Sequence, residues 1–168
     1  MKPFLFLPVL LFLIPALGTE YALAPPKSDL VGTWKLISAI DTTDKGQIVR
    51  NVYGLNPTGF LTYTADGRMM AIITDGGRKP LSVPDRVSAP ASERAEAFAT
   101  SVAYGGRYTL DGDKVIHHVE VSAMQNTVNT ELVRTIVKLE GKRVTLRTPL
   151  FSRAGLKVTE ELVWERMN

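Results

Sequence analysis

Cysteine is absent from the 168 residues of this chain. Without thiols there is no disulfide framework, no thiolate site for zinc and no cysteine to carry a lipid anchor. The folded protein must therefore be held together by its hydrophobic core alone. A chain of 168 residues is long enough for one such core and leaves little room for a second.

A concentrated run of positive charge is also missing. The chain has 20 Lys and Arg residues against 17 Asp and Glu residues, which gives a formal net charge of +3. These basic residues are scattered through the predicted strands and turns, whereas nucleic-acid-binding proteins usually gather them in one run or on one face. We therefore expect no nucleic-acid partner.

Histidine is scarce: His117 and His118 are the only two, and they are adjacent in the stretch KVIHHVEVS. Successive side chains of a β-strand point to opposite faces, so these two imidazoles cannot enter the same site. With no cysteine and no third histidine to complete a ligand set, we expect neither a metal site nor a cofactor. The chain also has no Gly-x-Ser-x-Gly sequence, so nothing supports a Ser-His-Asp hydrolase.

The long apolar run lies at the start of the chain, where Lys2 is followed by fourteen almost wholly apolar residues at 4–17. This pattern predicts a secretory signal peptide over residues 1–24, with cleavage near residue 18 or residue 24. The run is shorter than the roughly 20 residues of a membrane span, so we expect membrane contact only through an uncleaved leader. We expect export to the periplasm or out of the cell, with residues 25–168 as a single mature domain.

Short strand-like runs make up most of the remaining sequence. Several are separated by links that contain glycine, such as Asp111-Gly112-Asp113 and Glu140-Gly141-Lys142, which are typical of tight antiparallel turns. Strands do not alternate with helices, so the pattern predicts an all-β antiparallel sandwich or barrel of about eight or nine strands. The runs read LVGTWKLISAI, GFLTYTA, RMMAIIT, GRYTLD, KVIHHVEVS, TELVRTIVKLE, KRVTLRT and LKVTEELVWERM.

One segment has the spacing of a helix, from Pro90 to about Tyr104, where Gly105-Gly106 supplies a stop. Its apolar residues recur every three or four positions and form one stripe. A single stripe predicts that the helix lies against the outside of the sheet or closes one end of a barrel. The preceding residues 75–89 lack periodicity and suit either a loop over a barrel mouth or a passive connector.

Two short motifs connect this pattern with a known family. A Gly-x-Trp opening at Gly32-Thr33-Trp34, together with Trp164-Glu165-Arg166 on the last strand, resembles the lipocalins. The resemblance implies that Trp34 plugs the closed base of a barrel and that Arg166 packs over the indole. The stretches YGLNP, GFLTYTADGRMMA, SERAEAF, GRYTLDGDKVIHHVE and ELVWERM are similar to the small lipocalin-like domain proteins of the calycin superfamily.

This resemblance runs from Leu30 to Met167 and implies an antiparallel lipocalin-like barrel with one helix and a central cavity. A departure follows the histidine strand, where QNTVN stands in place of the Pro-Asn-x-x-Gly loop of that family. Barrels of this size commonly hold one small ligand, so binding or carriage of a small, largely apolar or lipophilic molecule is the expected function. The oligomeric state is left open.

The candidate ligand-binding residues are aromatic side chains near strand ends and one histidine, although each also suits simple packing. Alternation favours placing His117 inside with Val115, Val119 and Val121, and His118 outside with Glu120. An inward-facing Arg134 would suit a ligand carboxylate, but we expect Arg134 at the surface, because Val133, Thr135, Val137 and Leu139 make the better inward set. The ligand-binding candidates are Trp34, Tyr53, Tyr63, Tyr104, Tyr108 and His117.

Two other functions stay open. If His118 and Glu120 point inward instead, a carboxylate beside an imidazole suits the acid-base pair of a cofactor-independent isomerase, cyclase or hydratase. His117 is the alternative acid-base residue for such an enzyme. An envelope protein-interaction module would instead have a contiguous apolar patch outside the barrel and an interior filled with side chains.

Overall fold

The computed structural model describes residues 26–49 and 51–168, so the predicted signal peptide lies outside the described residues. Strands account for more than half of the described residues, which also contain one α-helix and two short 3-10 helices. In chain order the elements are η1 (Lys27–Asp29), β1 (Gly32–Thr43), β2 (Ile48–Val49), β3 (Pro57–Tyr63), β4 (Arg68–Asp75), α1 (Ala91–Ala99), β5 (Ser101–Asp111), β6 (Lys114–Ser122), η2 (Gln125–Thr127), β7 (Glu131–Glu140), β8 (Arg143–Arg147), β9 (Phe151–Arg153) and β10 (Leu156–Arg166).

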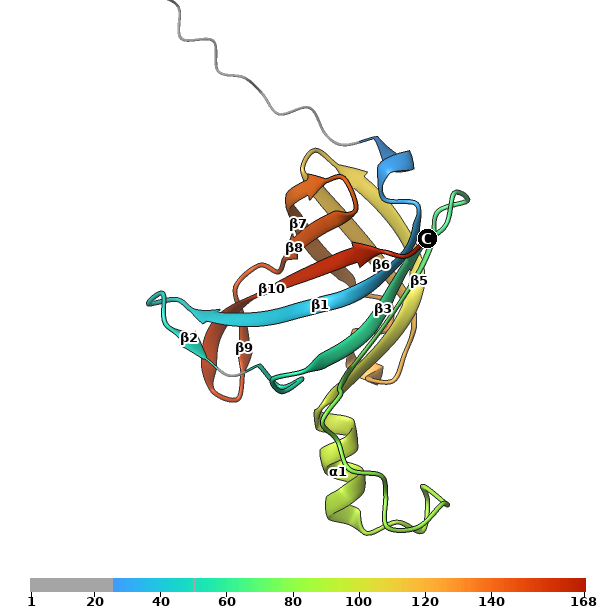
Figure 1. Ribbon diagram of the computed structural model, residues 1–168, viewed down its shortest axis with the longest axis vertical. Helices are drawn as coiled ribbons and strands as arrows, with labels where there is room; N and C mark the ends of the chain where they lie inside the picture. Colours follow the sequence, from blue (N-terminus) through green and yellow to red (C-terminus); the bar gives the residue numbers. More distant parts are fainter. Residues whose placement is uncertain (1–25, 50) are drawn as a thin grey trace, which may run out of the picture.

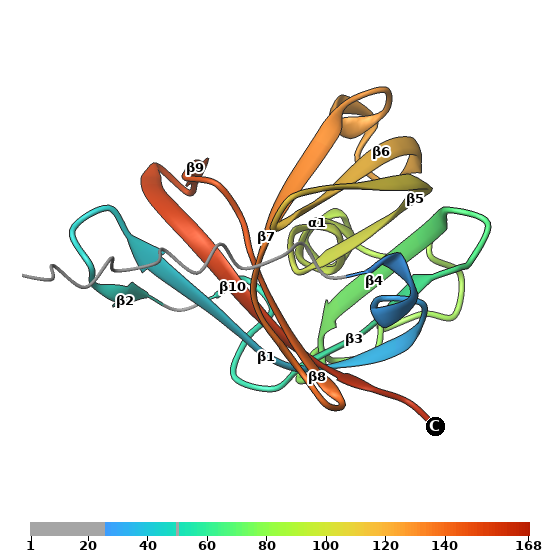
Figure 2. The same cartoon turned by 90° about the horizontal axis from the view of Figure 1, so that it is seen from above.

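Eight of the strands close into an antiparallel barrel in the order β1-β3-β4-β5-β6-β7-β8-β10, because β10 also pairs with β1. That closing ladder runs from Trp34 opposite Arg166 to Thr43 opposite Val158, and both ribbon views show β1 beside β10 (Figures 1 and 2). The predicted all-β antiparallel barrel is therefore confirmed. Each predicted strand-like run overlaps one barrel strand, whereas the short flanking strands β2 and β9 were not predicted.

The core fills the inside of the barrel through strict alternation along most strands. In β4, Met69, Ala71 and Ile73 are buried, while the intervening Met70 and Ile72 are exposed. Removing the inward side chains from water is the main force that closes the barrel, at about 25 cal/mol per Å² of apolar surface.

The base of the barrel is sealed by the predicted contact between Trp34 and Arg166. The Trp34 indole is fully buried, its N–H donates to the carbonyl of Leu30 at 2.8 Å, and the Arg166 guanidinium lies 4.1 Å from the ring centroid. Gly32 has a φ of 138°, and a Cβ there would lie 2.7 Å from Nη1 of Arg166. Glycine is therefore required, because a side chain would displace a cation–π contact that stabilises by roughly 0.5–2 kcal/mol.

The helix is shorter than predicted, and its apolar stripe is not packed. α1 ends at Ala99, none of its residues is buried, and Phe98 is exposed. Residues from Ser101 onward belong to β5, where Ser101 pairs with Thr74 and Tyr104 pairs with Ala71. The ladder to β4 satisfies the backbone groups of residues that have helical spacing, so pairing overrides periodicity there.

Together with residues 76–90, α1 lies beyond the end of the barrel where β4 ends and β5 begins (Figure 1). No helix within residues 26–49 and 51–168 has both the length and the apolar character needed to cross a membrane.

Candidate functional site

The barrel encloses a cavity of about 150 Å³. Aliphatic side chains from β3, β4, β7, β8 and β10 form much of its wall, among them Leu61, Ile73 and Leu132. The wall also contains several polar groups, which is unusual for an interior that serves packing alone. These polar lining residues are Tyr53, Tyr104, His117, Thr127, Arg134, Arg153 and Glu160.

His117 projects into the barrel and is held between two tyrosines. Its Nε2 lies 2.6 Å from the hydroxyl of Tyr63, and its Nδ1 lies 3.0 Å from the hydroxyl of Tyr104. Burial, with a contribution from the positive charge of Arg134, holds the pKa of His117 well below its usual value. The imidazole is therefore neutral, and both its nitrogens are occupied by tyrosine hydroxyls. A ligand in the cavity meets this group through Tyr104, which lines the cavity with His117.

Arg134 lines the cavity, so the prediction that it lies at the surface is wrong. It pairs with the buried Val115, and residues directly opposite each other in a ladder point to the same face. The cause is a bulge in β7, where Ile136 pairs with Leu146 but Lys138 already pairs with Thr145. The extra residue, Val137, breaks the alternation that placed 133, 135, 137 and 139 on one face.

A similar bulge in β6, the strand that contains both histidines, reverses the face to which one side chain points. Gly105 pairs with Val121 but Gly106 pairs with Val119, so Glu120 is the extra residue in β6. Val121 is consequently 67% exposed, whereas the sequence pattern had placed it inside with His117. The predicted inward position of Val119 is confirmed, since this residue is buried.

A buried charged cluster forms a second polar part of the cavity wall. Nη1 of Arg153 lies 2.8 Å from Oδ2 of Asp41 and 2.9 Å from Oε1 of Glu160. The Asn51 side-chain amide donates to both carboxylates at 2.9 Å. Burial raises the pKa of Asp41, and Arg153 opposes this shift. The cluster also touches Tyr53, because the Arg153 guanidinium lies 5.8 Å from that ring centroid.

Of the six predicted ligand-binding residues, Tyr53, Tyr104 and His117 line the cavity, and the other three do not. Trp34 belongs to the base of the barrel. Tyr63 bonds to Nε2 of His117 through its hydroxyl, and its ring packs at a tilt against that of Tyr108, with ring centroids 4.7 Å apart. The hydroxyl of Tyr108 is used in a hydrogen bond to the carbonyl of Thr64.

His118 and Glu120 do not form a pair. His118 lies on the outer surface, where Nδ1 is 3.2 Å from Oε1 of Glu131, and Nε2 is 2.8 Å from the hydroxyl of Thr109. Glu120 is exposed and pairs instead with Arg68 and Arg107. An acid-base role for this pair required both side chains to point inward, and they do not.

Three charged lining residues were missed by sequence reasoning. Arg134 was placed on the wrong face, and Arg153 lies on a strand of three residues that has no period to detect. Glu160 occupies an inward position of β10, between the buried Val158 and Leu162. That alternation, read from the well-predicted last strand, is the one signal that identifies Glu160. Trp164 was noticed for its motif and also lines the cavity.

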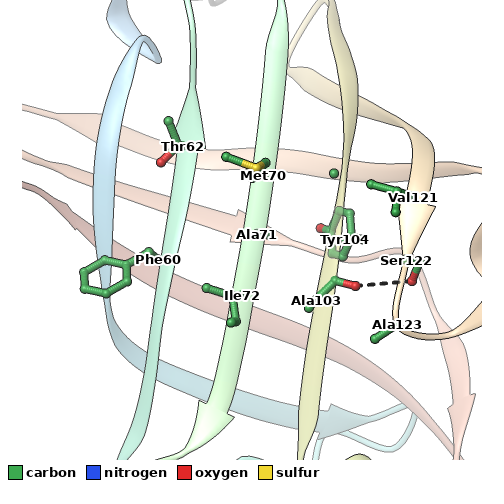
Figure 3. Close-up of a pocket in the computed structure, with 11 residues that line it drawn as sticks. Phe60, Thr62, Met70, Ala71, Ile72, Ala103, Tyr104, Val121, Ser122 and Ala123 are labelled. Carbon is green, nitrogen blue, oxygen red and sulfur yellow. Dashed lines mark hydrogen bonds between the residues drawn. The ribbon is translucent and has the colours of Figure 1, made fainter.

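The outer face of the barrel has an apolar hollow of about 450 Å³ over β3, β4, β5 and β6. Phe60, Met70, Ile72 and Val121 contribute exposed side chains to it (Figure 3). An interaction module was expected to combine such a patch with a filled interior, but this barrel has both a patch and a cavity. Within the described residues, no group of three or more His, Cys, Asp or Glu side chains gathers as metal ligands would.

Comparison with protein families identifies the fold. A family model described as a lipocalin-like domain matches residues 31–167. The chain belongs to the lipocalin-like domain family. Lipocalin-like barrels typically bind small hydrophobic ligands, and comparison with curated proteins finds no match for this chain.

Several solved structures resemble this lipocalin-like barrel. A redesigned β-barrel has 13% identity and a TM-score of 0.41, and the match covers 86% of this chain and 97% of that one. An uncharacterized protein from Bacteroides eggerthii has 13% identity and a TM-score of 0.43, with 82% and 99% covered. A structure of EF1p2_mFAP2b bound to DFHBI has 12% identity and a TM-score of 0.41, with 83% and 95% covered. We draw no functional argument from these similarities.

Proposed function

We propose that this lipocalin-like protein binds one small molecule, about the size of a single aromatic ring, inside its barrel. The observation that supports the proposal is the cavity of about 150 Å³ with its mixed polar and apolar wall. A protein cavity of about 150 Å³ holds one benzene molecule, whereas drug-sized ligands occupy pockets of roughly 300–1,000 Å³. The ligand is therefore smaller than a fatty acid or a sterol.

The lining residues indicate how such a ligand would be held. Leu61, Leu132 and Ile73 offer apolar contact to a ring, and burial contributes about 25 cal/mol per Å² of apolar surface. Tyr104 and Arg134 add polar groups that can fix the orientation of a substituent. The expected ligand is thus a small amphipathic molecule, and it need not be lipophilic throughout.

The proposal is tested by ligand-observed NMR with toluene, benzyl alcohol and benzoate as probes. Replacing Leu132, which lines the cavity, by Trp fills the space and should abolish binding of every probe. Val133→Trp is the matched control, because Val133 pairs with Ile116 on the opposite face of the same strand. Circular dichroism verifies that both variants are folded. Binding that persists in Leu132→Trp, or no binding of any probe to the unmodified protein, contradicts the proposal.

We also propose that the protein is exported. The support is the sequence of residues 1–24, with Lys2 before a short apolar run. Expression of the full chain, followed by cell fractionation and mass spectrometry of the N-terminus, tests this. The expected product lies outside the cytoplasm and begins near residue 19 or residue 25. A full-length chain confined to the cytoplasm is the contrary result.

A further inference from the structure

The hydrogen bonds around His117 determine where each proton of the group lies. Tyr63 is 1% exposed, and among the described residues its hydroxyl has one hydrogen-bonding partner, Nε2 of His117. A buried hydroxyl that accepted a proton from Nε2 would leave its own O–H without an acceptor, which is costly. Tyr63 therefore donates to Nε2. Because the imidazole is neutral, its single proton is on Nδ1.

The proton on Nδ1 of His117 determines which hydrogen bonds Tyr104 can make. Nδ1–H of His117 donates to the Tyr104 hydroxyl oxygen, 3.0 Å away. The O–H proton of Tyr104 is not used in this chain of hydrogen bonds, and Tyr104 lines the cavity. Each donor in such a chain polarises the next, so the last O–H is a better donor than an isolated phenol. The cavity consequently contains a hydroxyl with its proton available to a ligand.

Arg134 provides positive charge beside the same hydroxyl. It lines the cavity, it hydrogen-bonds to the carbonyl of Val133, and its charge opposes the increase that burial causes in the pKa of Tyr104. Within the described part of the chain no carboxylate pairs with Arg134. Arg153 differs, since Asp41 and Glu160 already neutralise it. A partly buried guanidinium without a counter-ion favours an anion in the adjacent space.

The carboxylate in the cavity wall does not compete for these donors. Glu160 lines the cavity, but it is already bonded to Asn51 and Arg153. Trp164 also lines the cavity, and its Nε1 is buried without a hydrogen-bond partner among the described residues. The Tyr104 hydroxyl and the Arg134 guanidinium are therefore the groups to which ligand oxygen atoms would bond.

We infer that the ligand is an aromatic-ring-sized carboxylate, bound through the Tyr104 hydroxyl and the Arg134 guanidinium. The inference rests on the proposed function, because it specifies the chemistry of the molecule in that cavity. Tyr63 and His117 are positioning residues, because both nitrogens of His117 are bonded to tyrosine hydroxyls and the group acts on the ligand through the Tyr104 proton. Glu160 and Asp41 oppose an anion, but the Arg153 guanidinium is paired with both carboxylates and offsets one of their two negative charges.

The test compares benzoate, benzyl alcohol and benzylamine, which have similar shapes and different charges, by isothermal titration calorimetry. Benzoate should bind at least roughly tenfold more tightly than the others, since a charge-assisted hydrogen bond typically has that effect. Arg134→Met and Tyr104→Phe should remove this preference and retain binding of benzyl alcohol. Arg147→Met, which removes one positive charge from the outer face, should leave the preference unchanged.

A second measurement requires no ligand. The ¹⁵N spectrum of the His117 ring should show a protonated Nδ1 and an unprotonated Nε2. A proton on Nε2, tight binding of benzylamine, or a benzoate preference that survives Arg134→Met overturns the inference while leaving the proposed function intact. If none of the three probes binds, the carboxylate site fails, and if toluene does not bind either, the proposed function fails with it.

Discussion

Replacing Arg153 by Met is expected to destabilise this barrel more than replacing any surface arginine. Nη1 of Arg153 is 2.8 Å from Asp41 and 2.9 Å from Glu160, and the carboxylate side chains are 1% and 6% exposed. Met has a similar length but no charge. The substitution therefore leaves two buried carboxylates that share one neutral donor, the amide of Asn51.

The loss follows from the cost of an unpaired buried charge, which is about 3–5 kcal/mol when one partner of a buried pair is removed. For a domain of this size, that corresponds to a fall in Tm of roughly 6–20 °C. Arg147→Met is the matched control: Arg147 is 2.7 Å from Glu161 in an exposed pair, with side chains 47% and 36% exposed. Its removal should cost under about 1 kcal/mol.

The loss of unfolding free energy caused by Arg153→Met should be smaller at acidic pH. Burial raises the pKa of Asp41 above 3.8, and Arg153 is one of the groups that oppose the shift. Without Arg153 the folded protein takes up a carboxyl proton at a pH where the unfolded chain is still ionised, so its relative stability increases as the pH falls. Urea unfolding at about pH 7.5 and about pH 5 measures both deficits. A deficit below about 1 kcal/mol, or one that is equal at both pH values, would refute the reasoning.

Two further predictions concern the site. Burial holds the pKa of His117 well below 6.5 in the folded protein, so the unfolded chain binds more protons below that pH. The unfolding free energy should therefore fall on acidification by up to about 1.4 kcal/mol per pH unit, and the His117 ring should not titrate near pH 6.5 by NMR. Deleting Val137 removes the bulge of β7 and leaves every inward residue in place, so this variant should fold and still bind the aromatic probes. Deleting Val133 instead forces Leu132 or Arg134 out of the cavity, and it should abolish probe binding in the same NMR assay.

Alternation along the strands was sufficient to predict an all-β antiparallel fold and the inward position of His117, whereas the closed barrel was implied by the resemblance to the lipocalins. The barrel strands carry long enough runs for a period of two to be clear, and the Trp34 and Arg166 motif defines which end is closed. Tertiary pairing limits what such patterns reveal. Asp41 and Arg153 are 112 residues apart in the chain, and neither position has a local pattern that marks it as part of a buried cluster.

The residues that sequence reasoning placed on the wrong face lie next to bulges. One extra residue at Glu120 turns Val121 outward, and one extra residue at Val137 lets Arg134 and Leu139 share the inner face. A strict period of two permits only one of those last two residues to point inward, because they are five positions apart. Leu139 is apolar and packs against the core. In an unbroken strand, an inward Leu139 would therefore require Arg134 to point outward. The bulge removes this conflict, and it brings into the cavity the guanidinium on which the proposed carboxylate site depends.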